Sequence, residues 1–226
     1  MASDFSVELF WSFRSPYSYL VLPRVLALAE QHGVHWQVRI VYPLAVRYPD
    51  HFKKMHPLAR PYFYRDSQRV AEFLGMPFRR PVPDPIVQDP LTLEISPQQP
   101  HIRRLTWLGI EAERRGRGLE FMREVSRLLW DGSVDDWHLG EHLAHAAARA
   151  GLDLAQLQAA IDAAPEQYEA QVEANQEAQY AAGHWGVPLM VYQGEPFFGQ
   201  DRFDLLVWRL NQSGLGQADL TQETAS

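Results

Sequence analysis

Two short hydrophobic segments near the N-terminus flank a segment with helical periodicity. Residues 6–13 are rich in Val, Leu, Phe and Trp and stop at an Arg-Ser-Pro sequence, which predicts a buried strand of the parallel-sheet type. Ser15 stands where a helix N-cap belongs, Pro16 takes the first helical position, and Gly33 ends the helix. Residues 34–42 alternate into a second strand. A crossover this short predicts a β-α-β unit with parallel strands.

The central part of the chain changes to helical periodicity. Residues 77–100 interrupt it with 7 of the 16 prolines, a density that neither a helix nor a central strand tolerates, so we expect an ordered, extended loop there. Apolar residues at three- and four-residue spacings predict six helices around this loop, at residues 57–74, 101–115, 119–130, 136–150, 154–163 and 166–182.

The C-terminal part returns to strand patterns. Residues 188–192 and 195–198 are separated by Gln193-Gly194, which predicts a two-residue hairpin, and Gln200-Asp201 opens a final amphipathic helix. The whole outline predicts an α/β fold in which a large all-helical insertion splits one sheet along the chain. We therefore expect a discontinuous sheet domain, a helical insertion domain and a disordered tail, at residues 1–43 with 184–212, 44–183 and 213–226, respectively.

Charge and composition narrow the possible partners. The 226 residues include 21 basic and 28 acidic side chains, a formal net charge of −7. Because this acidic balance leaves no basic patch, we expect neither nucleic acid nor an anionic membrane as a partner. The N-terminal residues lack the pattern of a signal peptide, and no apolar run reaches the roughly 18 residues of a membrane span, so we expect a cytoplasmic protein.

The sequence contains no cysteine. This excludes a disulfide framework, a zinc-thiolate site and any reaction in which the protein supplies the thiol. Any sulfur chemistry must therefore use a sulfur atom that a ligand brings.

Three short motifs fall where an α/β sheet usually binds ligands. Ser15-Pro16-Tyr17-Ser18 lies at a strand-to-helix turn, where a helix N-terminus offers free N–H groups to an anion or a thiolate; the alternative is that Ser15 is only an N-cap. In Gly186-Val187-Pro188 a proline opens a strand; the alternative is a purely structural role, because proline is tolerated at the first position of a strand. In Gly199-Gln200-Asp201-Arg202 the aspartate equally fits a capping role. The residues by themselves leave these alternatives open.

The order of these motifs along the chain resembles the 2-hydroxychromene-2-carboxylate isomerase family. That family has a thioredoxin fold and is grouped with kappa-class glutathione transferases and, more distantly, with bacterial disulfide oxidoreductases. The resemblance extends over residues 6–210 and includes Pro23-Arg24, Pro83-Asp84-Pro85 and residues 62–66. It implies a thioredoxin-like fold with a helical insertion, a homodimer, and glutathione as the cofactor.

The resemblance also implies roles for single residues. Ser15 stands in the place of the reactive cysteine of the oxidoreductases and would hydrogen-bond the thiolate of bound glutathione, lowering its pKa. Pro188 would be a cis-proline, so that the Val187 main chain pairs with glutathione like an added strand. Asp201, with Gln200 beside it, would hold the γ-glutamyl end. In the family reaction the thiolate adds to the ring of 2-hydroxychromene-2-carboxylate, a bond rotates, and the thiol leaves again.

The segment expected to contact an aromatic carboxylate substrate departs from the family's usual sequence. Family members usually have an asparagine after the second strand, and residues 43–64 contain none. The chain's two lysines, Lys53 and Lys54, lie in this segment with Arg60, and we expect one of these cations to bind the substrate carboxylate. Tyr17 would supply part of a flat apolar wall, although aromatic side chains near a turn are more often core residues.

Three other functions remain as alternatives. The first two are a kappa-class-like glutathione transferase and a non-catalytic thioredoxin-fold binding protein, because the fold does not determine the second substrate. The third is a metal enzyme, since His138 and His142 match the H-x-x-E-H zinc motif. Gly140 between the histidines and the lack of an identifiable third ligand favour a solvated polar helix face, so we expect no metal.

Overall fold

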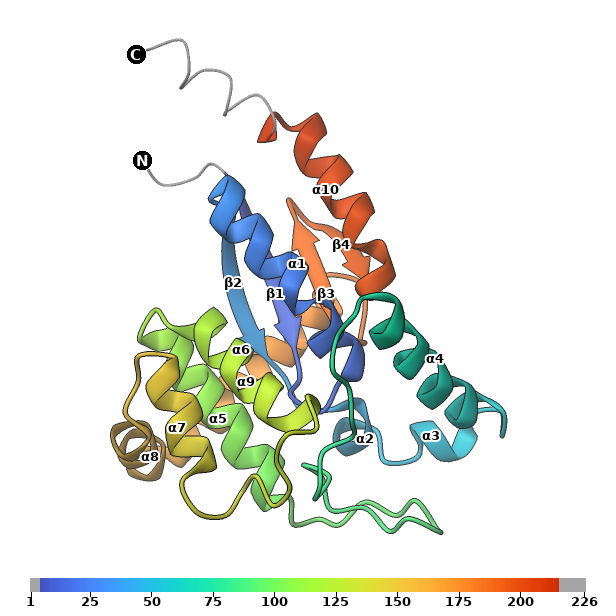
Figure 1. Ribbon diagram of the computed structural model, residues 1–226, viewed down its shortest axis with the longest axis vertical. Coiled ribbons are helices and arrows are strands. Elements are labelled where there is room, and N and C mark those ends of the chain that lie inside the picture. Colours follow the sequence, from blue (N-terminus) through green and yellow to red (C-terminus); the bar gives the residue numbers. More distant parts are fainter. Residues whose placement is uncertain (1–4, 216–226) are drawn as a thin grey trace.

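The computed structural model describes residues 5–215, and a mixed four-stranded sheet lies at its centre (Figure 1). The strands are β1 (Ser6–Trp11), β2 (His35–Ile40), β3 (Leu189–Tyr192) and β4 (Glu195–Phe198), in the order β2-β1-β3-β4. β1 and β2 pair in parallel, whereas the β1–β3 and β3–β4 pairs are antiparallel. The predicted α/β fold, its β-α-β unit and its C-terminal hairpin are confirmed.

Helix α1 (Pro16–His32) connects the two parallel strands, and both of its ends follow from local sequence. The Ser15 side chain accepts a hydrogen bond from the Ser18 N–H as N-cap, at 3.2 Å, and Pro16 needs no partner at the first helical position. Gly33 has a φ of 62° and donates its N–H to the Ala29 carbonyl, which ends the helix. The N-terminus of α1 consequently lies just beyond the end of β1.

The helical part of the chain contains the six predicted helices. They are α4 (Ala59–Phe73), α5 (Pro100–Arg114), α6 (Gly118–Trp130), α7 (His142–Arg149), α8 (Leu154–Ala163) and α9 (Pro165–Ala181). Two further helices, α2 (Leu44–Arg47) and α3 (His51–Lys54), were not predicted, because four residues are too few to show a helical period.

The prediction that α7 begins at residue 136 was wrong. Residues 136–141 form turns, with a φ of 50° at Asp136 and 55° at Gly140, and these left-handed conformations interrupt a right-handed helix. His138 and His142 therefore do not share one helix face. Within residues 5–215, no three His, Cys, Asp or Glu side chains form a group that could hold a metal ion.

Two groups of helices lie on either side of the end of the sheet where β1 and β2 terminate (Figure 1). Figure 1 shows α5 to α9 on one side of the strand ends and α2 to α4 on the other, while α10 lies beside β4. Close contact ties the first group to the strands: a Cβ on Gly109 of α5 would lie 3.0 Å from Phe13 and 3.1 Å from Ile40. Asn175 of α9 donates to the Ile40 carbonyl, and Trp130 of α6 donates to the Phe13 carbonyl. One hydrophobic core consequently continues from the sheet into the helices.

The proline-rich segment is ordered, as predicted. It lacks helices and strands apart from a bridge between Gln88 and Ile95, and it contains a cis peptide at Val82–Pro83. The amide of the buried Gln99 both donates to and accepts from the Val87 backbone. This hydrogen bonding gives the segment a defined course past the end of β1.

The hairpin turn has positive φ at both Gln193 and Gly194, as a type I′ turn requires. After it, the short helix η1 (Gln200–Arg202) leads into α10 (Phe203–Gln212). The predicted disordered tail begins too early, because Leu215 is buried in the core; the rest of that prediction lies outside the described residues. None of the described helices is long and apolar enough to span a membrane.

Candidate functional site

A cavity of about 510 Å³ lies where β1 ends and α1 begins. Its walls come from six parts of the chain: the β1–α1 turn, the α2–α3 region, α4, the proline-rich segment, the C-terminal end of α6, and the segment before β3 with the end of β4. The lining includes the aromatic residues Tyr17, Phe52, Phe63, Phe78 and Trp130. A largely apolar cavity of this size suits a small organic ligand.

The Ser15 hydroxyl joins the N-terminus of α1 to the segment before β3. Its Oγ accepts the Ser18 N–H and donates to the Val187 carbonyl oxygen at 3.3 Å, across 172 positions in sequence. The Val187–Pro188 peptide is cis, as the resemblance implied. Ser15 and Val187 both line the cavity, whereas Pro188 lies buried behind it.

The Val187 backbone leaves one hydrogen-bonding group free. Within residues 5–215 its N–H has no partner, and its carbonyl accepts only the Ser15 hydroxyl. Gly186 beside it has no room for a side chain, since a Cβ would lie 2.3 Å from the Phe198 ring. The result is a short stretch of accessible main chain directly opposite a helix N-terminus.

Tyr17 lines the cavity as expected, but it is also a structural link. Its hydroxyl donates to the Asp66 carboxylate of α4 at 2.6 Å, and its ring packs edge-on against Phe63. Burial raises the pKa of Tyr17, and the hydrogen bond to Asp66 raises it further. The side chain is therefore a neutral hydroxyl that holds α4 against α1.

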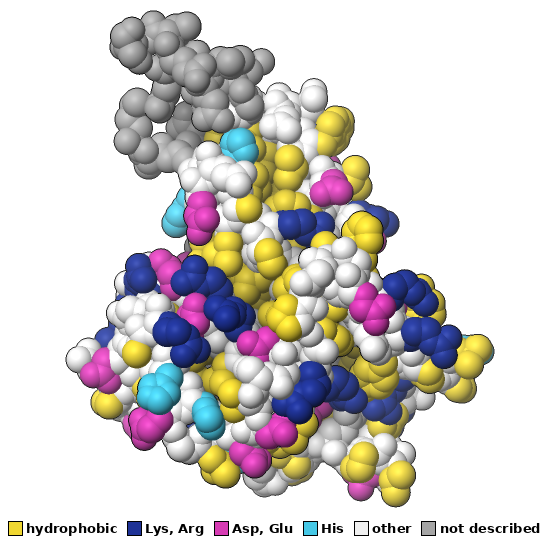
Figure 2. All heavy atoms as spheres, viewed as in Figure 1, with side chains coloured by type: hydrophobic (Ala, Val, Ile, Leu, Met, Phe, Trp, Pro, Cys, Tyr) yellow, Lys and Arg dark blue, Asp and Glu magenta, His cyan; other side chains and the backbone are white. Residues whose placement is uncertain are grey.

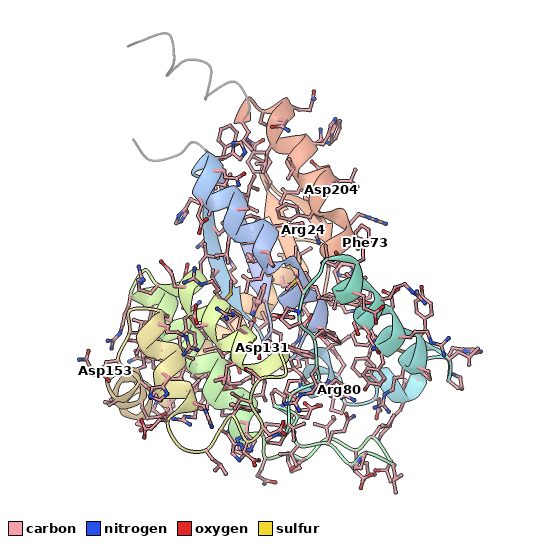
Figure 3. The ribbon with its side chains drawn as sticks, viewed as in Figure 1. Arg24, Phe73, Arg80, Asp131, Asp153 and Asp204 are labelled. Atoms are coloured by element: carbon pink, nitrogen blue, oxygen red, sulfur yellow. The ribbon has the colours of Figure 1, made fainter. Side chains whose placement is uncertain are left out.

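Gln200 and Asp201 lie outside the cavity lining. Arg24 of α1 holds Gln200 through two hydrogen bonds. Its Nη2 donates to the Gln200 backbone carbonyl at 2.8 Å and to the Gln200 side-chain oxygen at 2.6 Å. Figure 3 shows Arg24 between α1 and α10. Asp201 is exposed and pairs with Arg202 at 2.9 Å. Its charge is a minor contributor to the raised pKa of Tyr17, after burial and the hydrogen bond to Asp66.

Only one of the three expected cations lines the cavity. Arg60 does, and it donates to the Tyr64 hydroxyl at 3.2 Å. Lys53 and Lys54 are exposed and lie outside the lining, and Lys54 pairs with Asp50. The short helix α3 turns its His51 and Phe52 face toward the cavity, which leaves the two lysines on the solvent side.

Two arginines that the sequence pattern did not indicate, Arg14 and Arg80, also line the cavity. Arg14 forms a two-pronged ion pair with Asp84 of the proline-rich segment, Nε to Oδ1 at 2.7 Å and Nη2 to Oδ2 at 2.9 Å. Arg80 reaches the same carboxylate at 3.2 Å. The signals were present, since Arg14 directly precedes Ser15 and Asp84 lies in a Pro-Asp-Pro motif, but nothing local indicates that they meet.

An aromatic stack forms the wall beside the cis peptide. The His184 ring stacks on Trp185, with centroids 4.6 Å apart, and on Phe198, 3.8 Å apart. Its Nδ1 accepts the Gly186 N–H at 2.9 Å, and burial lowers the pKa of His184. Both effects favour a neutral imidazole with the proton on Nε2.

Comparisons with known proteins agree with this architecture. The sequence profile of the DsbA-like thioredoxin domain matches residues 6–211, and no curated protein gives a significant sequence match. A solved 2-hydroxychromene-2-carboxylate isomerase is 21% identical, with a TM-score of 0.68, covering 96% of this chain and 99% of that chain. A probable DsbA oxidoreductase from Streptomyces coelicolor is also 21% identical, with a TM-score of 0.63 and coverage of 92% and 88%.

A third similar structure is the cytosolic disulfide reductase DsbM from Pseudomonas aeruginosa, solved with GSH. It is 15% identical, with a TM-score of 0.57, covering 92% of this chain and all of that chain (100%). At these identities the three structures show the fold alone. The predicted thioredoxin-like fold with its helical insertion is thereby confirmed.

Proposed function

Because this chain belongs to the DsbA-like thioredoxin family yet contains no cysteine, we propose that it uses the thiol of glutathione and acts as an isomerase of the 2-hydroxychromene-2-carboxylate type. Without a cysteine, the chain has no thiol of its own for thiol–disulfide exchange. The observation that carries the proposal is the Ser15 hydroxyl, held at the N-terminus of α1 opposite the cis Val187–Pro188 peptide.

The main chain at Val187 fits a peptide-like ligand. A glutathione cysteinyl unit would pair with the free Val187 N–H and with the Val187 carbonyl, as an added strand does. Ser15 has only one hydroxyl hydrogen, which now goes to that carbonyl over 3.3 Å. When the ligand's N–H takes over the carbonyl, the hydroxyl is released to donate to the ligand's sulfur. The two contacts are therefore compatible with each other.

The environment of Ser15 favours a charged sulfur. Thiols at helix N-termini have lowered pKa values, because free N–H groups and the helix dipole stabilise the thiolate. A hydroxyl donor adds a charge-assisted hydrogen bond. Bound glutathione supplies a nucleophile that this chain lacks.

For the other end of glutathione we propose Asp201 and Gln200. Asp201 is exposed, and its ion pair with Arg202 is a surface contact that an ammonium group can replace at low cost. Arg24 already fixes the Gln200 backbone through two hydrogen bonds. A similar structure solved with GSH supports glutathione as the ligand.

The second substrate we propose is an aromatic carboxylate. The cavity is about 510 Å³, lies next to Ser15 and has largely aromatic walls, and a 2-hydroxychromene-2-carboxylate isomerase is among the similar structures. Tyr17 is part of this wall, and Arg60 lines it as a cation for the carboxylate, whereas Lys53 and Lys54 lie outside the lining.

Calorimetric titration of reduced glutathione tests the proposal. We expect wild-type protein to bind, and Asp201→Ala to bind roughly ten- to a hundredfold more weakly, since a charge-assisted hydrogen bond contributes about 1.5–3 kcal/mol. Asp162→Ala, on the exposed side of α8, is the matched control and should bind like wild type. No binding to wild type would contradict the cofactor assignment and favour a non-catalytic binding protein.

Turnover then separates the two catalytic alternatives. Isomerisation of 2-hydroxychromene-2-carboxylate without consumption of glutathione supports the isomerase. Stoichiometric loss of glutathione with an electrophilic substrate instead supports a kappa-class-like transferase. We also propose a homodimer and a cytoplasmic location, which size-exclusion chromatography with light scattering and cell fractionation would test.

A further inference from the structure

The charged residues that line the cavity are mostly positive. The ionised lining residues are Arg14, Arg60, Arg80 and Asp84, an excess of two positive charges in a chain whose net charge is −7. On the face shown in Figure 2, Lys and Arg side chains lie on both sides of the strand ends, over the α5 to α9 helices and over α4. The arginines of the cavity share one largely apolar space, although the Arg80 side chain is also 49% exposed to solvent.

Asp84 holds two of these arginines in a fixed geometry. It accepts both prongs of the Arg14 guanidinium, one hydrogen bond from Arg80, and the Ile86 N–H at 3.1 Å. The Arg14 side chain is only 16% exposed. Because one carboxylate serves two guanidinium groups, the cluster retains one uncompensated positive charge.

The Tyr64 ring is a second contact that orients Arg80. The Arg80 guanidinium lies 4.4 Å from the centroid of the Tyr64 ring, and Arg60 lies 5.7 Å from the same ring. Figure 3 shows Arg80 on the segment that passes between the α5 to α9 helices and α4. Tyr64 therefore holds both guanidinium groups at the cavity without neutralising either.

Two polar groups of the β1–α1 turn remain without partners. Ser12 is 1% exposed and lines the cavity, yet its hydroxyl has no hydrogen-bond partner among the described residues. The Arg14 hydrogen bonds use Nε and Nη2 only, which leaves Nη1 free within the same part of the chain. An unpartnered buried hydroxyl is costly unless a ligand or water satisfies it.

We propose that Arg14 and Arg80, oriented by Asp84, bind a carboxylate group of the second, aromatic substrate, with the Ser12 hydroxyl as an additional donor. The inference rests on the proposed function in naming the ligand a second substrate, but the site itself is testable without glutathione. Arg14 directly precedes Ser15, so a carboxylate held there keeps the attached ring next to the proposed position of the sulfur. Arg14 and Arg80 thus add two cations to Arg60, which also lines the cavity.

The test uses a fluorescent probe pair that differs only in charge, coumarin-3-carboxylate and coumarin-3-carboxamide. For Arg14→Gln and Arg80→Gln we expect roughly ten- to a hundredfold weaker binding of the carboxylate and little change for the amide. Arg65→Gln is the matched control, because Arg65 is exposed on α4 and does not line the cavity. Equal weakening of both probes, or no weakening of the carboxylate, would overturn the proposal.

Folding of the variants can be judged separately. Arg14→Gln leaves Asp84 paired with Arg80 and the Ile86 N–H, so no carboxylate becomes unpaired. Arg14→Lys retains the positive charge but loses the planar guanidinium that donates two parallel hydrogen bonds. We expect its affinity for the carboxylate to lie between those of wild type and Arg14→Gln. Lysine and glutamine variants with identical affinities would contradict a charge-based role.

A glutathione arm distinguishes the two possible sources of the carboxylate. Glutathione and its glycyl ethyl ester differ only in the glycine carboxylate. If Arg14→Gln weakens glutathione but neither its ester nor the coumarin acid, Arg14 binds the cofactor and the proposal fails. If glutathione does not bind while the coumarin acid depends on Arg14 and Arg80, the proposed function fails and the anion site remains.

Discussion

Replacing Ser15 with alanine removes one oxygen atom from the centre of the proposed site. In the free protein that oxygen accepts the Ser18 N–H at 3.2 Å and donates to the Val187 carbonyl at 3.3 Å. In the proposed complex it donates to the sulfur of glutathione instead. The substitution therefore acts both on stability and on the ionisation of the bound thiol, and the two effects can be measured separately.

The magnitude for the thiol follows from the hydrogen bond that is lost. A hydrogen bond to a charged group contributes about 1.5–3 kcal/mol, which corresponds to a thiol pKa raised by roughly one to two units. An ordinary thiol has a pKa near 8.5, and thiols at helix N-termini lie at about 7.5 or lower. With α1 unchanged, we expect Ser15→Ala to return the bound thiol most of the way to its ordinary pKa and to lower turnover at neutral pH about tenfold or more.

The assay is a pH titration of the ultraviolet absorbance of the thiolate in the glutathione complex. Ser15→Thr keeps a hydroxyl and should retain a lowered pKa. Ser18→Ala is the matched control, because Ser18 is buried in the same helical turn and its Oγ has no partner among residues 5–215. Loss of the N-cap should also lower the free energy of unfolding by about 1 kcal/mol.

Two results would refute this reasoning. If the wild-type complex shows no lowered thiol pKa, the helix N-terminus and hydroxyl do not act on the sulfur. If Ser15→Ala titrates like the wild type and Ser18→Ala, then Ser15 is only an N-cap, which is the alternative that the sequence left open.

Three further predictions concern residues around the site. Arg24→Gln should weaken glutathione binding several-fold in calorimetry, since Arg24 fixes the backbone of Gln200 through two hydrogen bonds; reduced stability with unchanged affinity would show that Arg24 only ties α1 to η1. Burial lowers the pKa of His184, so as the pH falls below about 6.5 the unfolded chain takes up a proton at this residue before the folded protein does. The stability that the neutral His184 contributes above that pH is therefore lost on acidification. In chemical denaturation, the free energy of unfolding of His184→Gln should fall less steeply with decreasing pH than that of wild type. Gly186→Ala should lower the free energy of unfolding by about 1–3 kcal/mol, because its Cβ would lie 2.3 Å from Phe198; unchanged thermal unfolding would contradict this packing.

Much of the fold could be predicted because its signals are local. Ser15, Pro16 and Gly33 define both ends of α1 through capping hydrogen bonds within a few residues. Gln193-Gly194 specifies its hairpin turn in the same way, since both residues have positive φ. The helices from α4 to α9 were located by their apolar period, except where left-handed residues at 136 and 140 delayed the start of α7.

The site could be predicted only in part. The motifs containing Ser15 and Val187 were chosen from their place in the strand and helix pattern and from a family resemblance, and the structure brings these two residues within hydrogen-bonding distance. Lys53 and Lys54 lie outside the cavity lining, and the sequence could not show this, because the direction of a side chain on a four-residue helix depends on what that helix packs against.

The sequence by itself therefore determined the order and ends of most elements, the thioredoxin-like pattern, and the absence of any protein thiol. Only the tertiary structure decided which distant residues meet: Ser15 with Val187 across 172 positions, and Arg14 with Asp84 across 70. The physical reason is that caps, turns and periodicity depend on neighbours a few residues away, whereas a cavity and its charges depend on how β1, α4 and the proline-rich segment pack together.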